Sequence, residues 1–104
     1  MRLIYKILSR SEWERALADG WFLGSEVDAA DGYIHFSTAA QVVETARRYF
    51  PGQRDLVVFS VDADGLGSSL KWEPSRGGAL FPHLYSPLDC SLVIEARRLD
   101  TSRA

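Results

Sequence analysis

Residues 55–61, with the sequence Asp-Leu-Val-Val-Phe-Ser-Val, constrain the fold of this chain more than any other segment. β-Branched and aromatic residues favour extended backbone, and a short, nearly continuous apolar run is typical of a strand buried on both faces. We therefore predict a central strand at this position. Shorter strands are predicted at residues 3–8, 33–36, 70–73 and 90–98, with a brief extended piece at residues 21–24.

Two helices are predicted in the first half of the chain. Ser11 and Glu14 have the spacing of a capping box, so the first helix should begin at Ser11. Thr38 and Gln41 repeat this spacing at the start of the second helix, although Ser37 is an equally good cap. A Pro-Gly pair should end that second helix.

Two segments are predicted to lack regular structure. Residues 25–32 are acidic and end in an Asp-Gly turn signal, so we expect a loop there. Residues 79–88 contain two prolines, which lack an N–H, and we therefore expect no regular central strand. The pattern predicts one α+β domain spanning residues 1–104, with a core at about residues 3–99 and a polar tail at residues 100–104.

Charge and cysteine content narrow the classes of partner. The net charge is −2, which does not favour a long nucleic acid or an anionic membrane, although a small anion held by one or two arginines is compatible with it. No run of about 18 apolar residues is present. Cys90 is the single cysteine, so an intramolecular disulfide is excluded and a cytoplasmic location is expected. We interpret Cys90 as a small core residue rather than a nucleophile.

The first polar motif, residues 31–38, joins a predicted strand to a predicted helix start. Unpaired N–H groups at a helix N-terminus attract phosphate or carboxylate groups. His35 alternates with Ile34 and Phe36, so it should face a cleft or the solvent if those two residues fill the core. Ser37 and Thr38 could donate to a ligand, but capping is the more common role at this place.

The second polar motif, residues 72–78, runs from the end of the strand predicted at residues 70–73 into a loop, and it contains several residues that could contact a ligand. Trp72 alone would usually belong to a core, and Glu73 with Arg76 could form an ordinary surface ion pair. Two glycines follow, however, and they would allow the backbone to approach a ligand closely. Arg76 beside them offers a planar donor for a carboxylate or a phosphate.

The third motif, residues 81–85, has the sequence Phe-Pro-His-Leu-Tyr. Irregular segments that carry a histidine and a tyrosine, here His83 and Tyr85, are typical of binding sites. We predict that these motifs converge on one small-molecule or nucleotide site. No Cys/His spacing indicates zinc, and neither a phosphate-binding glycine loop nor a nucleophile elbow is present.

The order and spacing of these motifs resemble the bacterial and plant family called domain of unknown function 952, over nearly the whole chain. That family is similar in fold to the ADP-ribosyltransferase superfamily, which includes RNA 2′-phosphotransferases and holds NAD or an ADP-ribosylated intermediate between two small β-sheets. The resemblance therefore implies a split β-sheet core and NAD or ADP-ribose as the leading ligand. The residues that carry it are Trp13, Ala16, Leu17, residues 31–38 with Gln41, residues 72–74 and residues 81–85.

By this resemblance, His35 would contact a ribose, Arg76 would hold a pyrophosphate and Tyr85 would stack on a planar ring. The superfamily also uses a glutamate late in the fold, for which Glu73 and Glu95 are the candidates. The predicted catalytic residues are His35, Glu73 and His83, and the predicted ligand-binding residues are His35, Ser37, Thr38, Trp72, Arg76 and Tyr85.

Three functional hypotheses follow from the sequence. The first is an ADP-ribosyltransferase-like enzyme that acts on NAD or a related nucleotide. The second is a non-catalytic module that binds a metabolite or a partner in the same cleft. The third is a structural domain in which the aromatic residues are core and the two histidines lie far apart. A fold-level resemblance does not by itself choose among them.

Overall fold

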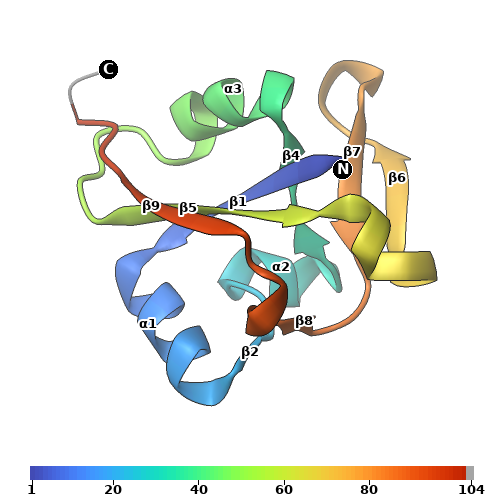
Figure 1. Cartoon of the computed structure of the whole chain (residues 1–104). Helices are drawn as coiled ribbons and strands as arrows, with labels where there is room; N and C mark the ends of the chain where they lie inside the picture. Colours follow the sequence, from blue (N-terminus) through green and yellow to red (C-terminus); the bar gives the residue numbers. More distant parts are fainter. Residues whose placement is uncertain (103–104) are drawn as a thin grey trace.

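The computed structural model describes residues 1–102, except for the side chain of Arg76, and has an α+β architecture (Figure 1). No helix in this part of the chain is long and apolar enough to cross a membrane. The elements in order are β1 (Leu3–Ser9), α1 (Arg10–Asp19), β2 (Trp21–Phe22), α2 (Glu26–Asp31), β3 (Ile34–His35), β4 (Ser37–Thr38), α3 (Ala39–Tyr49), β5 (Leu56–Asp62), η1 (Ala63–Ser69), β6 (Leu70–Pro74), η2 (Arg76–Gly78), β7 (Leu80–Leu84), β8 (Leu88–Asp89), η3 (Cys90–Leu92) and β9 (Glu95–Leu99).

The predicted central strand is confirmed as β5, an inner strand of a four-stranded sheet with the order β4-β1-β5-β9. β5 pairs antiparallel with the whole of β1, from Leu3 opposite Asp62 to Ser9 opposite Leu56. Helix α3 lies over one face of this sheet and α1 over the other (Figure 1). Both faces of β5 are therefore covered, which explains its nearly continuous apolar sequence.

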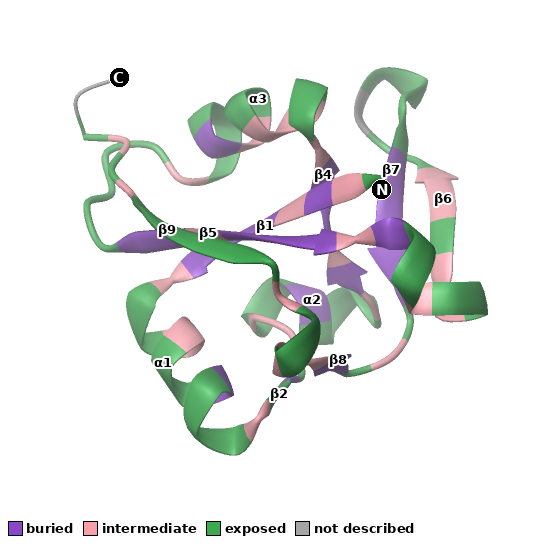
Figure 2. Cartoon of the chain, viewed as in Figure 1, coloured by how far each residue is buried: buried purple, intermediate pink, exposed green. Residues whose placement is uncertain are grey.

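The larger part of the core lies on the α1 side of the four-stranded sheet, and a smaller cluster lies under α3. Phe59 is at the centre of the larger part, where Trp13, Phe22 and Phe36 pack against its ring. The smaller cluster is built around Ile7, with Ala46 from α3. Figure 2 shows the buried residues concentrated on β1, β5 and β7, whereas β9 is an exposed edge.

A three-stranded sheet with the order β3-β7-β6 provides the frame for the polar motifs. Its central strand is β7, so the prediction that two prolines exclude a central strand here was wrong. Pro82 accepts a hydrogen bond from the backbone N–H of Phe36 at 3.0 Å but has no N–H to return one. The pairing of β3 with β7 accordingly ends there, and the chain continues into β4 of the other sheet.

Several predicted boundaries also need correction. The first helix is capped by Ser9, with Glu12 as its capping-box partner, and not by Ser11 with Glu14. The acidic residues 25–32 contain the short helix α2 and are not a loop, because Ser25 caps a turn that ends at Gly32. The last strand is β9 alone, since residues 90–92 form a 3₁₀ turn. Thr38 is confirmed as the cap of α3.

Candidate functional site

Helix α2 places a carboxylate in the protein interior. The backbone N–H of Ser25, the residue before the helix, donates to Asp28 Oδ2 at 2.9 Å. Gly24 precedes it with φ +110°, and a Cβ atom added there would lie 2.9 Å from the Cβ of Asp28. The close approach of this turn to the helix therefore requires a glycine. It leaves the side chain of Asp28 only 2% exposed.

Lys6 is the ion-pair partner of Asp28 and comes from the middle of β1. Its Nζ lies 2.8 Å and 2.9 Å from the two carboxylate oxygens, and its side chain is 6% exposed. Burial lowers the pKa of Lys6, while the negative charge of Asp28 acts in the opposite direction. Burial alone would raise the pKa of Asp28, but hydrogen bonds from His35 and Lys6 and the charge of Lys6 hold it well below its ordinary value.

His35 on β3 is held between two carboxylates of α2. Its Nδ1 lies 2.6 Å from Asp28 Oδ1 and its Nε2 lies 2.9 Å from Asp31 Oδ2, while its backbone N–H also donates to Asp28 Oδ1 at 3.1 Å. An ionised carboxylate only accepts hydrogen bonds, so in each of these two ring contacts the imidazole N–H is the donor. Both edges of the imidazole are thus oriented by α2.

His83 on β7 lies directly opposite His35 in the sheet register, and their ring centroids are 5.6 Å apart. Its Nδ1 is 2.8 Å from Glu73 Oε1, and the hydroxyl of Tyr85 donates to the same oxygen at 2.7 Å. Hydrogen bonds from Tyr85 and then from His83 lower the pKa of Glu73. The bond to Glu73 raises the pKa of Tyr85 to about 12.

The second ring nitrogen of His83 has a different environment. The side chain is 4% exposed, and among the described residues none is hydrogen-bonded to Nε2. Within residues 1–102, with the Arg76 side chain set aside, every fully enclosed side-chain nitrogen or oxygen has a partner. We conclude that Nε2 retains access to open space, which is the cavity that His83 lines.

Tyr33 completes the cluster and was not singled out in the sequence. Its ring stacks on His83, with centroids 4.1 Å apart at 28°, and lies 4.5 Å from the ring of His35 and 5.2 Å from that of Tyr85. Burial raises the pKa of Tyr33, and the negative charges of Asp31, Glu73 and Asp28 raise it further. Four rings from two neighbouring segments, residues 33–35 and residues 83–85, therefore form one aromatic cluster bordered by carboxylates.

A cavity of about 640 Å³ opens beside this cluster. Tyr33, His35 and His83 line it together with Lys6, Asp28 and Asp31. Tyr5 of β1 and Tyr49 at the end of α3 also line it. A volume of this order is sufficient for a small organic ligand. Among the described residues, no group of three or more His, Cys, Asp and Glu side chains could hold a metal ion.

The other predicted site residues have varied positions. Buried Ser37 lines the cavity, where its hydroxyl lies 3.1 Å from that of Thr45, while Thr38 caps α3 and its N–H donates to Gln41. Trp72 packs against the core, with the guanidinium of Arg2 4.3 Å from its ring centroid. The lining does not include Glu73 or Tyr85, and the predicted role of the Arg76 side chain lies outside the described residues.

Sequence reasoning missed two charged residues of the site, Lys6 and Asp28, and included Asp31 in the first motif without assigning it a role. Lys6 is a lone charge in an apolar strand, between Ile4 and Leu8 on the face that packs the core, and this was a usable signal. The Ser-x-x-Asp spacing from Ser25 to Asp28 was a second signal, because it is typical of a helix start.

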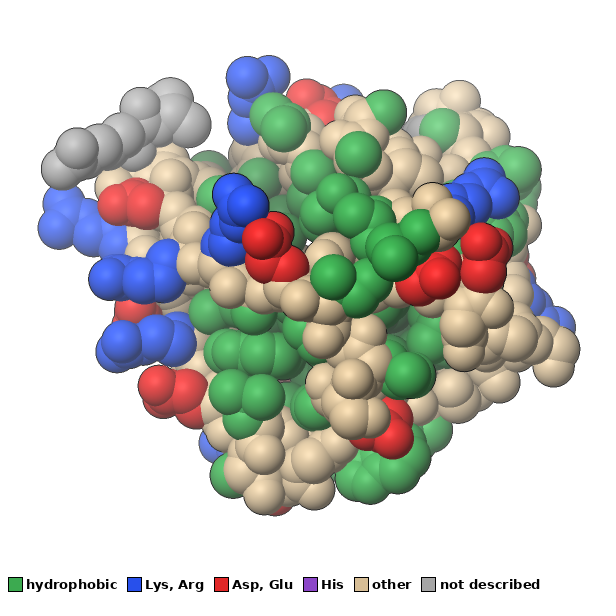
Figure 3. All heavy atoms as spheres, viewed as in Figure 1, with side chains coloured by type: hydrophobic (Ala, Val, Ile, Leu, Met, Phe, Trp, Pro, Cys, Tyr) green, Lys and Arg blue, Asp and Glu red, His purple; other side chains and the backbone are tan. Residues whose placement is uncertain are grey.

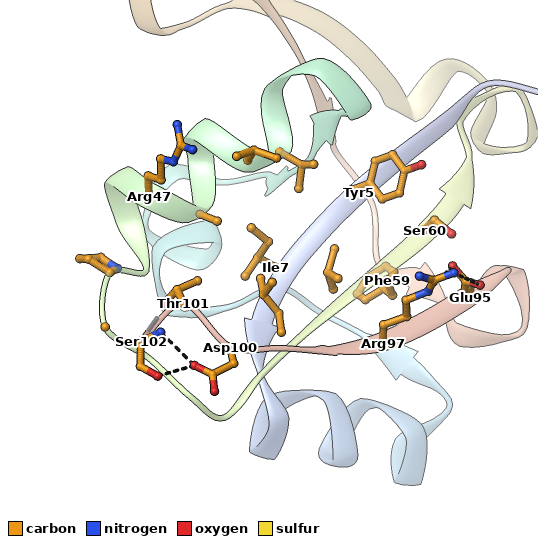
Figure 4. A pocket seen from close by; sticks show the side chains of 17 residues that line it. Tyr5, Ile7, Arg47, Phe59, Ser60, Glu95, Arg97, Asp100, Thr101 and Ser102 are labelled. Carbon is orange, nitrogen blue, oxygen red and sulfur yellow. Dashed lines mark hydrogen bonds and ion pairs between the residues drawn. The ribbon is translucent and has the colours of Figure 1, made fainter. Parts of the chain in front are cut away.

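A second and larger cavity lies between α3 and the four-stranded sheet, with a volume of about 930 Å³ (Figure 4). Ile7, Val58 and Leu99 give it an apolar floor, and Arg47 and Arg97 stand at its borders. Figure 3 shows several basic side chains gathered on this side of the molecule, beside β9. Glu95, the alternative late glutamate, lines this cavity and pairs with Arg97 at 2.9 Å. Glu95 belongs to β9 of the four-stranded sheet, whereas His35 and His83 belong to the three-stranded sheet.

Comparison with known proteins agrees with the spacing of the motifs. The family model described as protein of unknown function (DUF952) matches residues 7–96. The chain belongs to this family. It is similar to protein CC0527 from Caulobacter crescentus, whose X-ray structure is 58% identical with a TM-score of 0.92, covering 94% of this chain and 86% of that chain. The solution NMR structure of the same protein is 58% identical with a TM-score of 0.86, covering 96% and 86%. A search of curated proteins gave no significant match.

Proposed function

We propose that the cavity beside the aromatic cluster binds a nucleotide and that the chain is an ADP-ribosyl-transfer-type enzyme acting on NAD or a related molecule. The observation that carries this proposal is the pairing of His35 with His83 on adjacent strands at one cavity. The sequence resemblance supplies the ligand class, since it relates the His35 motif to the ribose contact of the transferase superfamily.

His83 is the proposed acid–base residue. A carboxylate that is hydrogen-bonded to one ring nitrogen orients an imidazole and leaves the other nitrogen available for proton transfer. In this protein Glu73 is bonded to His83 Nδ1, and Nε2 has no partner among the described residues. Glu73 is then a positioning residue that acts through His83. His35, held on both nitrogens by α2, is the proposed ribose contact, and it would exchange its bond with exposed Asp31 for one with the ligand.

An NMR titration tests the proposal. NAD or ADP-ribose should shift the resonances of Tyr33, His35 and His83, and His35→Ala and His83→Ala should each abolish those shifts. Arg47→Ala is the matched control, because Arg47 borders the other cavity and should leave the shifts unchanged. No response of the three residues at millimolar ligand would refute nucleotide binding at this site.

A non-catalytic binding module is the second candidate, and the position of Glu73 favours it. The transferase superfamily needs a glutamate that reaches the ribose, whereas Glu73 is bonded to His83 and Tyr85 and is not part of the lining. Release of nicotinamide from NAD, followed by chromatography, separates the two candidates. Turnover that is lost in His83→Ala supports the enzyme, and binding without turnover supports the module.

A further inference from the structure

The cavity beside Tyr33, His35 and His83 has an uneven distribution of charge. Four of its lining residues carry carboxylates, namely Glu12, Glu26, Asp28 and Asp31. Among the described lining side chains, Lys6 is the single lysine or arginine, and its ammonium is already paired with Asp28. Even with a positive charge on His35, the carboxylates outnumber the cationic groups of the described lining, so the potential inside the cavity is negative.

The aromatic cluster adds a second attraction for positive charge. The faces of aromatic rings carry negative partial charge and attract cations within about 6 Å. The cluster already holds one cation at its outer end, where Lys71 Nζ lies 5.6 Å from the ring centroid of Tyr85. Tyr33 lies at the inner end and lines the cavity. The raised pKa of Tyr33, due to burial and to Asp31, Glu73 and Asp28, agrees with a negative field at this ring.

A third feature points to a ligand independently of these charges. His83 is a buried polar side chain, 4% exposed, whose Nε2 faces the cavity without a partner among the described residues. Because Nε2 retains access to the cavity and has no partner among the described residues, it can form a hydrogen bond with a polar group of a ligand. The ligand must then place a polar atom at His83 and fill the space next to Asp31.

From these features we propose that the cavity recognises its ligand through a positively charged organic group, a planar cationic ring such as a pyridinium, placed between the Tyr33–His83 stack and the carboxylate of Asp31. This inference rests on the proposed function and deepens it, because it assigns the cationic end of a dinucleotide, and not its anionic pyrophosphate, to this cavity. A planar ring is favoured because Tyr33 and His83 already stack at 28°. Asp31 is half exposed and can turn toward an incoming cation.

Two probes that differ by one charge test this proposal. 1-Methylnicotinamide is a cation and nicotinamide is a neutral ring of nearly the same shape. Titration of each, followed by the NMR resonances of Tyr33, His35 and His83, should show tighter binding of the cation. Asp31→Asn should lower the affinity for the cation by about fivefold, which is the effect of one nearby charge in a solvated site. The affinity for nicotinamide should not change. Asp64→Asn is the control, because Asp64 is exposed on the 3₁₀ turn η1, and it should change neither of the two affinities.

The outcomes separate this inference from the proposed function. Equal binding of the two rings, or insensitivity of the cation to Asp31→Asn, would overturn the inference. If ADP-ribose shifts the three residues and 1-methylnicotinamide does not, nucleotide binding survives and cation recognition is wrong. If 1-methylnicotinamide binds and neither NAD nor ADP-ribose does, the cation site survives and the proposed nucleotide function is wrong.

Discussion

Asp28→Asn should be among the most destabilising substitutions of a polar residue in this chain. The carboxylate is 2% exposed and accepts from Lys6 Nζ, from the ring and backbone of His35 and from the N–H of Ser25. Neutralising it leaves the ammonium of Lys6, itself 6% exposed, buried without a counter-charge. Breaking a buried ion pair from one side costs about 3–5 kcal/mol. This is a large part of the total of about 5–15 kcal/mol expected for a domain.

Urea denaturation followed by circular dichroism measures this loss, and thermal unfolding gives a second reading. At about 4–8 °C per kcal/mol for a chain of this size, the melting temperature should fall by at least about 12 °C. Asp31→Asn is the control, since Asp31 is 46% exposed and its bond to His35 should contribute less than about 1 kcal/mol.

A double-mutant cycle identifies the cause. Lys6→Met removes the buried ammonium, so Asp28→Asn should cost less in that background than in the wild type, by at least about 1 kcal/mol. Equal costs in the two backgrounds would refute the buried charge as the reason. A loss below about 1 kcal/mol in the single Asp28→Asn variant would refute the whole argument.

Three further predictions concern the same region. The pKa of Asp28 is held below its ordinary value of 3.8, so its stabilising contribution is complete above that value and is lost as the pH falls through the folded-state pKa. The difference in stability between wild type and Asp28→Asn should therefore shrink as the pH falls. A difference in urea midpoints that stays constant with pH would contradict this prediction. Tyr85 should titrate at about 12 by NMR, and Glu73→Gln should return it toward 10.0, because the shift comes first from its bond to Glu73. Gly24→Ala should cost more than Gly20→Ala in urea titrations. Both glycines have positive φ, which costs about 1–3 kcal/mol for alanine, but a Cβ at Gly24 also meets Asp28 at 2.9 Å, whereas nothing lies within 4 Å at Gly20.

Elements encoded by neighbouring residues were predictable from the sequence. The apolar run at residues 55–61 became β5, and the Thr38–Gln41 spacing became the start of α3. These patterns depend on local periodicity and on backbone groups a few residues apart, which a linear reading can count. The short helix α2 was missed, although Ser25 and Asp28 had the right spacing, because its six residues have too few turns for a hydrophobic stripe.

The arrangement of the candidate site was decided by the tertiary structure. His35 and His83 could be nominated by type and by motif, but their 5.6 Å separation results from the register of β3 on β7, which pairs residues nearly fifty positions apart. The pairing of Lys6 with Asp28 depends in the same way on α2 folding against β1. Pro82 shows the limit most directly. Its missing N–H is tolerated in a central strand because the neighbouring strand ends at that point, and only the sheet order reveals this. The sequence by itself determined the α+β class and nominated His35 and His83 as candidate site residues. The tertiary structure alone decided which of them face one cavity, because strand register and burial are properties of the whole chain.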